Sequence, residues 1–591
     1  MSRRAWWRAF GCLALLWGAV PAAARAQDPP IVIDPDAPVS DSLRQLAPPA
    51  EVVARLVAVW EDSSTTRFVG SFVLPAGSEL SGTVALFRGM LVVHGTLRGP
   101  VHVINGDLWV GPAGVVDGPV VVTGGRIRVD PGGAITGSQQ AWGDPAPLYR
   151  TASGRLAPRE QRRILGDLGG TTRSFYTAGI STTLFLGTGG TYNRIEGLPL
   201  VVGPSFAHQA APTVDLRLDL RGILRTTSDP NGVRDRLGYD ARLEWVFGVP
   251  ARAVLGGRLR SEILAVEEAP YSRTESGWLA FLLHDDVRDY YQARGPEVYL
   301  EAEPFRGLTV LASLRQDEER SVRASDPISV FRTGRPWRPN PVVDDGTYRT
   351  ARLAVGLDTR NNRVEPSSGW LVKADWQYGV STDFAPAGIP RSVRDPLPAS
   401  REYHFGRLWV DARRYARFDP DTRLNLRVVG GGWTGGDPLP VQRRVSLGGG
   451  DLLPGYGFRD RNCNLGSAAD PGNDADPARP ALCDRALSVH AELRRRVNLG
   501  LLYRLERSQL TDLDRIIGFD RADLVLFANT GTAWLAGDGP GQVPVDRIPV
   551  LREWALDAGV GLDTGGLGFY VARSLVDREP VRFTVRLQRR F

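Results

Sequence analysis

Hydrophobic and polar residues alternate along most of the C-terminal two thirds of the chain. In the segment 213–224, Leu216 and Leu218 fall on one face, and Arg217 and Asp219 fall on the other. A period of two residues is typical of a β-strand with one apolar and one polar face. About 16 segments of this kind can be identified, near 193–207, 213–224, 236–248, 252–264, 276–284, 296–305, 308–322, 348–360, 369–379, 403–418, 422–433, 486–497, 523–534, 554–564, 567–576 and 581–591.

Alternation alone does not separate a soluble β-sandwich from a membrane barrel. The segments are long enough to cross a bilayer at a tilt, and arginines repeat on the polar face, which suits a wet lumen better than a dry core. The last segment carries Phe583 and ends on Phe591, the aromatic terminus typical of outer-membrane barrels. We therefore predict an all-β fold whose residues 191–591 form a transmembrane antiparallel β-barrel of about 16 strands in outer-membrane lipid. Because lipid offers no hydrogen-bond partner, we expect the sheet to close.

A second pattern precedes the barrel. Residues 99–117 ("GPVHVINGDLWVGPAGVVD") and 118–136 ("GPVVVTGGRIRVDPGGAIT") align without a gap, and 82–98 is a shorter copy. Alternating valines with a glycine at each corner predict stacked rungs, so we assign residues 65–140 to a small periplasmic β-solenoid of roughly four rungs. This repeat resembles the bactofilin-type, polymer-forming β-helix. It could be a rigid spacer, or a surface for self-association or for periplasmic partners.

The N-terminus has the features of an export signal. Three arginines precede an apolar run, and an Ala-Arg-Ala site ends at residue 26, so residues 1–26 are expected to be a cleaved secretory signal peptide; a twin-arginine signal is the alternative. Residues 27–64 are predicted to be a linker with one short helix, and residues 141–190 a second linker. Export and the barrel pattern together predict the bacterial outer membrane as the location.

Only two cysteines, Cys463 and Cys483, lie beyond the signal. In an exported protein such a pair predicts a disulfide, which should stabilise the fold by roughly 3 kcal/mol. The acidic residues between them fit a solvated loop or, as an alternative, a calcium site; they are Asp470, Asp474 and Asp476, with Asn473 beside them.

Several segments resemble one family, the outer-membrane insertase–translocase superfamily, also called the bacterial surface antigen barrels. "LDTRNNRVEPSSGW" (357–370), "SVHAELRR" (488–495), "LVLFANTGTAW" (524–534) and the two closing hairpins follow its order of motifs. "LGGGDLLPGYGFRD" (447–460) stands in the place of its sixth loop. The resemblance implies insertion, assembly or translocation of proteins, with unfolded outer-membrane proteins as clients.

In that family the sixth loop folds into the lumen, and an arginine at its tip binds acidic residues on the wall. Here the tip is Leu453-Pro454-Gly455-Tyr456, so proline stands in place of the arginine, and the matching wall residue is Asn529 rather than aspartate. Glu492 remains, and in the absence of a tip arginine we expect Arg459 or Arg461 to reach it instead. Gly449 and Gly450 should let the backbone approach the wall, while Tyr456 and Phe458 should anchor the tip. A loop that is disordered beyond Gly450 is the alternative.

The segment before the barrel lacks the βααββ pattern of the family's client-receiving modules, which leaves client capture open. Two other functions fit the pattern: a structural anchor for a periplasmic scaffold, and an arginine-lined channel. No catalytic, cofactor or metal-ligand motif is present, so we expect neither an enzyme nor a cofactor. The net charge of +6 is spread along the chain, which does not favour nucleic-acid binding.

Overall fold

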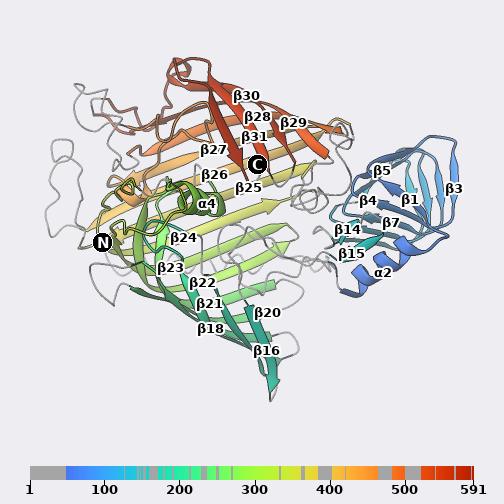
Figure 1. The fold of residues 1–591 in the computed structure, drawn as a ribbon, viewed down its shortest axis with the longest axis horizontal. Coiled ribbons are helices and arrows are strands. Elements are labelled where there is room, and N and C mark those ends of the chain that lie inside the picture. The colour runs from blue at the N-terminus through green and yellow to red at the C-terminus, as the bar shows by residue number, and fades with distance from the viewer. Residues whose placement is uncertain are drawn as a thin grey trace.

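The computed structural model describes two β-rich parts that follow one another along the chain (Figure 1). It describes residues 48–590 apart from 49, 126, 143–145, 147, 151–154, 159–170, 178–179, 189–191, 212–213, 228–235, 248–251, 268–270, 306, 332–333, 361–365, 384–401, 420, 464–481, 499–520, 540, 565–566 and 588. The predicted signal peptide, most of the first linker, the acidic loop and Phe591 therefore lie outside the described residues.

The first part is a parallel β-solenoid with three faces. Its sheets have the strand orders β1-β4-β7-β10-β13, β2-β5-β8-β11 and β3-β6-β9-β12. The strands are β1 (Thr66–Val69), β2 (Phe72–Leu74), β3 (Glu79–Ser81), β4 (Val84–Phe87), β5 (Met90–Val93), β6 (Thr96–Arg98), β7 (Val101–Ile104), β8 (Asp107–Val110), β9 (Val115–Asp117), β10 (Val120–Thr123), β11 (Ile127–Val129), β12 (Ala134–Ile135) and β13 (Gln139–Trp142). Val101 pairs with Val120 and Val103 with Val122, the partners that the sequence repeat predicts.

Glycines stack at the corners of the solenoid, as the repeat indicates. A side chain at Gly99 would come within 2.6 Å of the Gly82 carbonyl oxygen one rung away, and Gly99 has a φ of +131°. Gly118 occupies the same corner in the next rung and meets Gly99 in the same way. Only glycine fits both the backbone angle and the spacing between rungs at Gly99.

Helix α2 (Ala50–Glu61) covers one face of the solenoid. Its Leu56 and Trp60 are buried in a cluster with Phe87 and Ile104 on the outer side of the first sheet. β14 (Leu148–Arg150) and β15 (Leu156–Pro158) form an antiparallel pair that joins this cluster. His102 lies on the same face, where burial first and the nearby Arg55 second lower its pKa. The helix thus converts an exposed apolar face into a second small core.

The second part is one 17-stranded sheet in which every strand is antiparallel to the next along the chain. Its strands are β16 (Thr171–Thr177), β17 (Ile180–Thr188), β18 (Leu200–Ala211), β19 (Val214–Leu224), β20 (Leu237–Phe247), β21 (Arg252–Ala265), β22 (Tyr290–Phe305), β23 (Leu308–Ser321), β24 (Gly346–Asp358), β25 (Gly369–Ser381), β26 (Tyr403–Arg417), β27 (Thr422–Gly436), β28 (Arg485–Asn498), β29 (Arg521–Trp534), β30 (Ala555–Asp563), β31 (Gly568–Ser574) and β32 (Arg582–Arg586). Helix α4 (Arg273–Leu283) and two short 3-10 helices, η2 (Val441–Arg443) and η4 (Leu551–Glu553), lie in its connections.

Two expectations about this sheet are corrected. Residues 276–284, predicted to be a strand, lie mostly in helix α4, whose capping box between Ser272 and Glu275 fixes its start. Residues 171–188, expected to be linker, form β16 and β17, and Ile180, Leu184 and Leu186 of β17 are exposed on one face of that strand. The sheet therefore begins at Thr171 rather than near residue 191.

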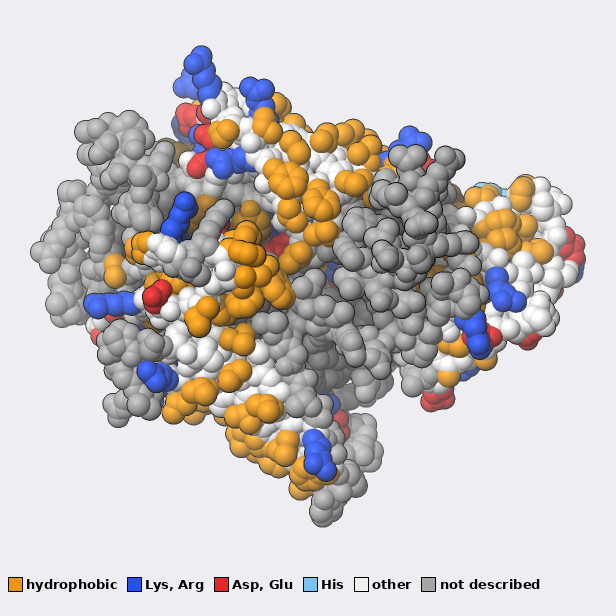
Figure 2. All heavy atoms as spheres, in the orientation of Figure 1, with side chains coloured by type: hydrophobic (Ala, Val, Ile, Leu, Met, Phe, Trp, Pro, Cys, Tyr) orange, Lys and Arg blue, Asp and Glu red, His pale blue; other side chains and the backbone are white. Residues whose placement is uncertain are grey.

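The sheet has the inverted polarity of a membrane barrel. On β27, Leu426 and Val428 are 40% and 45% exposed, whereas the side chain of Arg427 is buried between them on the other face. β28 repeats this arrangement with Leu493 outside and Glu492 and Arg494 inside. Figure 2 shows hydrophobic side chains spread over the outer surface of the strands. The predicted fold class, a barrel-type antiparallel sheet after a solenoid, is confirmed.

No strand pairing between described residues joins the two ends of the sheet. Among the described residues, β16 and β32 each have a strand partner on one edge only. β32 has only five residues, and Arg590, four residues beyond its end, is buried in the interior. This differs from the closure by strand pairing that we expected.

Candidate functional site: loop six in the barrel interior

Loop six, which we define as residues 437–484 between β27 and β28, carries the candidate site. Its tip is packed inside the sheet: Leu453 and Tyr456 are almost fully buried. The Gly455 amide donates a 2.7 Å hydrogen bond to the Asp557 carboxylate on β30. The backbone of the tip thus meets an acidic residue on the inner wall.

The tip is anchored a second time through the Tyr456 hydroxyl. This hydroxyl donates to Asp577 at 2.7 Å and accepts a 2.8 Å hydrogen bond from Ser574 at the end of β31. The Arg461 side chain also pairs with Asp577. Loop six is therefore fixed to the last hairpin of the sheet by both backbone and side-chain contacts.

The glycines of loop six allow these close approaches. A side chain at Gly455 would lie 2.6 Å from the Asp557 Cβ and 2.8 Å from the Arg573 backbone. Gly450 contributes its carbonyl oxygen, which accepts a 3.1 Å hydrogen bond from Arg586. Gly449 bonds within the loop, its amide donating to the Tyr456 carbonyl oxygen. Pro454 lies in the buried tip between Leu453 and Gly455.

Arg459 ties loop six to the far side of the interior. Its guanidinium donates to Glu267 at 2.7 Å and to Asp289 at 2.5 Å, and it stacks on the Phe458 ring at 4.7 Å. Burial alone would raise the pKa of Asp289, but the guanidinium groups of Arg459, Arg338 and Arg194 outweigh burial and lower it. Asp289 thus remains an anion that holds three loops together.

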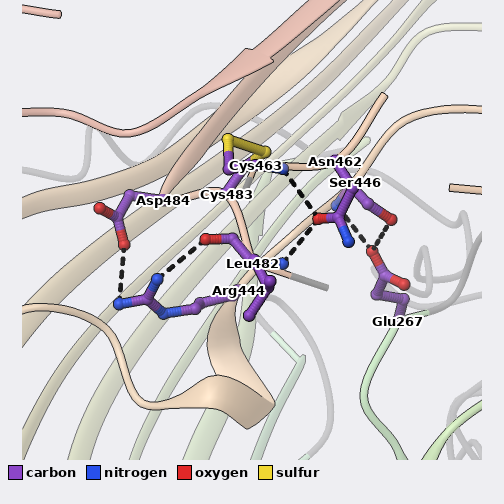
Figure 3. The surroundings of a disulfide bond; sticks show 8 residues. All are labelled: Glu267, Arg444, Ser446, Asn462, Cys463, Leu482, Cys483 and Asp484. Atoms are coloured by element: carbon purple, nitrogen blue, oxygen red, sulfur yellow. Dashed lines mark hydrogen bonds and ion pairs between the residues drawn. A yellow bond between two sulfur atoms is a disulfide. The ribbon is translucent and has the colours of Figure 1, made fainter. Parts of the chain in front are cut away.

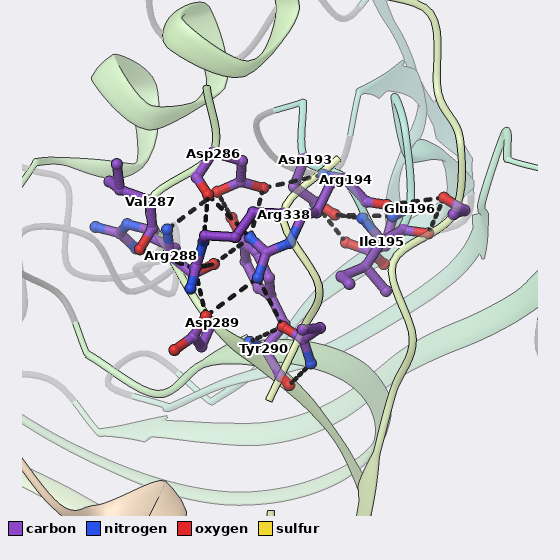
Figure 4. A network of polar contacts seen from close by, with 12 residues as sticks. Asn193, Arg194, Ile195, Glu196, Asp286, Val287, Arg288, Asp289, Tyr290 and Arg338 are labelled. Atoms are coloured by element: carbon purple, nitrogen blue, oxygen red, sulfur yellow. Dashed lines mark hydrogen bonds and ion pairs between the residues drawn. The ribbon is translucent and has the colours of Figure 1, made fainter. Parts of the chain in front are cut away.

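Figure 4 shows the other loops that meet at this anion. Arg194, from the β17–β18 connection, is fully buried and binds Asp286 at 3.4 Å and Asp289 at 3.1 Å. Asn340, from the β23–β24 connection, accepts a 3.0 Å hydrogen bond from Arg194. All these connections lie at the same end of the sheet as loop six, because alternate connections of an antiparallel sheet share an end. Together they form a polar cap over that end.

The two predicted wall residues have different partners from those expected. Glu492 on β28 pairs with Arg494 at 2.9 Å and with Arg590 at 3.1 Å, and all three side chains are buried. Since Arg459 and Arg461 bind other carboxylates, the expectation that one of them reaches Glu492 is wrong. Asn529 lies beside the pair and accepts a 3.1 Å hydrogen bond from Arg590.

Asn529 is the link between the C-terminal segment and loop six. Its amide nitrogen donates a 2.6 Å hydrogen bond to Asp557, the carboxylate that also holds Gly455. An aspartate at position 529 would place a second carboxylate against Asp557, which the buried site would resist. The amide lets one buried acid serve the loop tip while Arg590 neutralises Glu492.

Cys463 and Cys483 form the predicted disulfide, with their Cα atoms 5.0 Å apart (Figure 3). Around it, Asn462 accepts hydrogen bonds from the Cys463 and Leu482 amides, and Arg444 donates to the Leu482 carbonyl oxygen. The bond closes the segment 464–482. The candidate calcium residues fall outside the described part of this segment, and no group of three or more metal-ligating side chains occurs elsewhere in the described chain.

Two aromatic residues, Phe583 and Phe591, were predicted to mark the C-terminal end of the barrel. Phe583 on β32 is 64% exposed on the outer face, and its ring stacks on Phe569 at 6.3 Å. Phe591 lies outside the described residues. Among the helices that the structure describes, none is both long and apolar enough to span a bilayer.

Sequence reasoning missed four residues that hold the site together: Asp557, Asp289, Arg590 and Glu275. Asp557 and Arg590 occupy inward positions in alternating strands, so the sequence predicts that both side chains point inward. Their partners depend on the path of loop six through the interior. Glu275 directly precedes the segment 276–284 that was predicted to be a strand, and the Ser272–Glu275 spacing is the capping signal that was missed. The site consists of ion pairs and packed loops. Contacts of this kind suit a role in holding or changing the conformation of the loops.

Comparison with known proteins finds similarity to solved structures alone. No protein-family model matches the sequence, and no curated protein matches it. Among solved structures, BamA from Haemophilus ducreyi lacking POTRA domains 1–3 is similar at 12% identity and a TM-score of 0.38, over 74% of this chain and 79% of that chain. CdiB from Acinetobacter baumannii has 10% identity and a TM-score of 0.27, over 71% and 66%. The copper transporter OprC has 10% identity and a TM-score of 0.26, over 71% and 62%.

Proposed function

We propose that this outer-membrane barrel acts in the insertion, assembly or translocation of proteins at the bacterial outer membrane. The observation that carries the proposal is the edge at each end of the sheet, on β16 and on β32, that pairs with no other strand in the described part of the chain. An unpaired edge can accept an extended client segment by strand addition, where backbone hydrogen bonds supply the affinity. The motifs that resemble the insertase–translocase superfamily, including its sixth loop, support the same function.

The solenoid takes the position in the chain that client-receiving modules occupy in that superfamily. Asp107 on β8 lies 3.4 Å from Arg417 at the end of β26, so the solenoid lies at the end of the sheet opposite loop six. On an outer-membrane barrel this is the periplasmic end. Delivery of unfolded clients would then depend on the solenoid or on a periplasmic partner that it binds.

Depletion of the protein in its native host, followed by outer-membrane proteomics, tests this function. We expect a set of outer-membrane proteins to be lost from the membrane and to accumulate unfolded in the periplasm. An unchanged outer-membrane proteome would refute the proposal.

A second candidate function is a membrane anchor for a periplasmic scaffold. It is favoured by the first rung of the solenoid, where Val69 and Val73 are each 44% exposed and Phe68 stacks on Phe72. An apolar end rung of this kind fits self-association. Full-length protein in lipid nanodiscs should then form pairs or filaments through the solenoid, and strictly single particles would exclude this role.

The arginine-lined channel is less well supported. Lumen arginines such as Arg242 and Arg413 are paired with aspartates at 2.6 Å and 2.7 Å, so the interior does not present a continuous positive surface. Planar-bilayer recordings that show anion-selective conductance would instead support a channel function.

A further inference from the structure

Helix α4 lies in the opening between the two ends of the 17-stranded sheet (Figure 1). It belongs to the β21–β22 connection and is a well-defined helix. Ser272 caps its N-terminus in a reciprocal capping box with Glu275, and His284 ends it with a φ of 58°. A connection of this length can join two strands without a helix. The contacts that α4 makes therefore indicate the role of the helix.

One side of α4 holds the last strand. The Glu275 carboxylate accepts hydrogen bonds from the Arg586 side chain at 2.8 and 3.1 Å and from the Leu587 amide at 2.8 Å. Glu275 and Arg586 are both buried, and Arg586 also lies over the Tyr271 ring at 5.7 Å. A buried, multiply bonded ion pair fixes the position of α4 against β32.

The opposite side of α4 contacts the chain next to the first strands. Tyr192 follows β17 by four residues, and its ring packs edge-on against Phe281 at 5.3 Å. Tyr192, Ala280 and Trp337 share a buried apolar cluster. Helix α4 therefore bridges the two ends of the sheet that no strand pairing joins among the described residues.

The last turn of α4 exposes two apolar side chains. Phe281 and Leu283 are 36% and 38% exposed, and the adjoining segment Ile328–Phe331 includes Ile328 at 82% and Phe331 at 57%. This segment is bonded to the helix, since the Val330 amide donates to the Phe281 carbonyl oxygen at 2.8 Å. In Figure 2, hydrophobic side chains gather over this region, between the strands at the two ends of the sheet.

We propose that α4 closes the gap between the described ends of the sheet and that the exposed apolar side chains of its last turn, with those of the adjoining segment Ile328–Phe331, contact membrane lipid there. On neighbouring β32, which α4 contacts through Glu275, Phe583 is 64% exposed and Val585 43% exposed. A helix satisfies its own backbone hydrogen bonds, so it can fill a gap in lipid where an open loop could not. The occupant of this surface is the acyl-chain region near the membrane interface at the loop-six end. The inference requires only that the barrel lies in a bilayer, and holds whether or not clients are inserted.

Fluorescence quenching by lipid tests the inference. Besides Cys12 in the predicted signal, the only cysteines are the disulfide-bonded pair, so the full chain accepts a single added cysteine carrying an environment-sensitive dye. Phe281→Cys is compared with Phe583→Cys on the lipid-facing strand and with Val129→Cys, an exposed valine of the solenoid. In phosphatidylcholine vesicles with nitroxide-labelled acyl chains, we expect quenching at position 281 close to that at 583 and about threefold or more above that at 129.

A second label guards against a folding defect in Phe281→Cys, since Phe281 packs on Tyr192. Ile328→Cys replaces the most exposed side chain of the same surface and should be quenched to the same degree. Only preparations that migrate as folded barrels on unheated gels are compared. Quenching at both 281 and 328 no greater than at 129 would overturn the proposal.

Discussion

Replacing Gly455 by alanine should release the tip of loop six from the barrel interior. The added methyl group would lie 2.6 Å from the Asp557 Cβ and 2.8 Å from backbone of Arg573, and neither neighbour is the flexible end of a side chain. Overpacking of a filled site costs about 1–3 kcal/mol, and loss of the Gly455 amide bond to a carboxylate costs about 1.5–3 kcal/mol. Together these give roughly 2.5–6 kcal/mol against the packed tip.

Limited trypsin digestion of the folded protein measures this release. Arg459 is buried and Arg461 is held by Asp577, so both should resist cleavage in the wild type. In Gly455→Ala, a band cut at these arginines should appear at low protease concentration on a denaturing gel. The control is Gly257→Ala on β21, where a side chain would meet nothing within 4 Å. Equal protection in both variants would refute the packing of loop six.

Three further changes probe other parts of the structure. Arg590→Ala should destabilise the barrel in urea by about 3–5 kcal/mol because it removes one partner of a buried ion pair. Adding Glu492→Gln to this variant should recover part of the lost stability. Additive effects of the two substitutions would contradict direct pairing. Replacing Cys463 and Cys483 by serine should lower stability by roughly 3 kcal/mol, and reductant should then change the variant no further. Burial lowers the pKa of His102, so solenoid stability should be constant above about pH 6.5 and fall below it; a melting profile that His102→Leu leaves unchanged would contradict this.

The sequence was most informative where one face of a strand is charged. On β27 and β28 the alternation of leucine or valine with arginine specifies the strand, its two faces and the solvent on each side. The nineteen-residue repeat specified the pairing of the solenoid strands, because each rung must repeat its glycine corners to stack. Local patterns suffice in both cases since each residue's role depends on its immediate neighbours.

The sequence was less informative where local signals compete or where contacts are distant. Residues 276–284 form an apolar run that fits a strand or a helix equally, and only the cap at Ser272 separates the two. Glu492 and Arg590 lie far apart in the chain, and the alternation predicts that both face inward but not that they bind one another. The same holds for Asp289, which joins arginines that lie far apart in the chain.

The central claim is that the outer face of the sheet contacts hydrocarbon while its charged face is enclosed. Fractionation of the native host after washing the membranes with alkali and urea tests it directly. We expect the processed protein to stay in the outer-membrane fraction and to dissolve only when detergent is added. Recovery of folded protein from the periplasmic extract without detergent would contradict the barrel and the functions built on it.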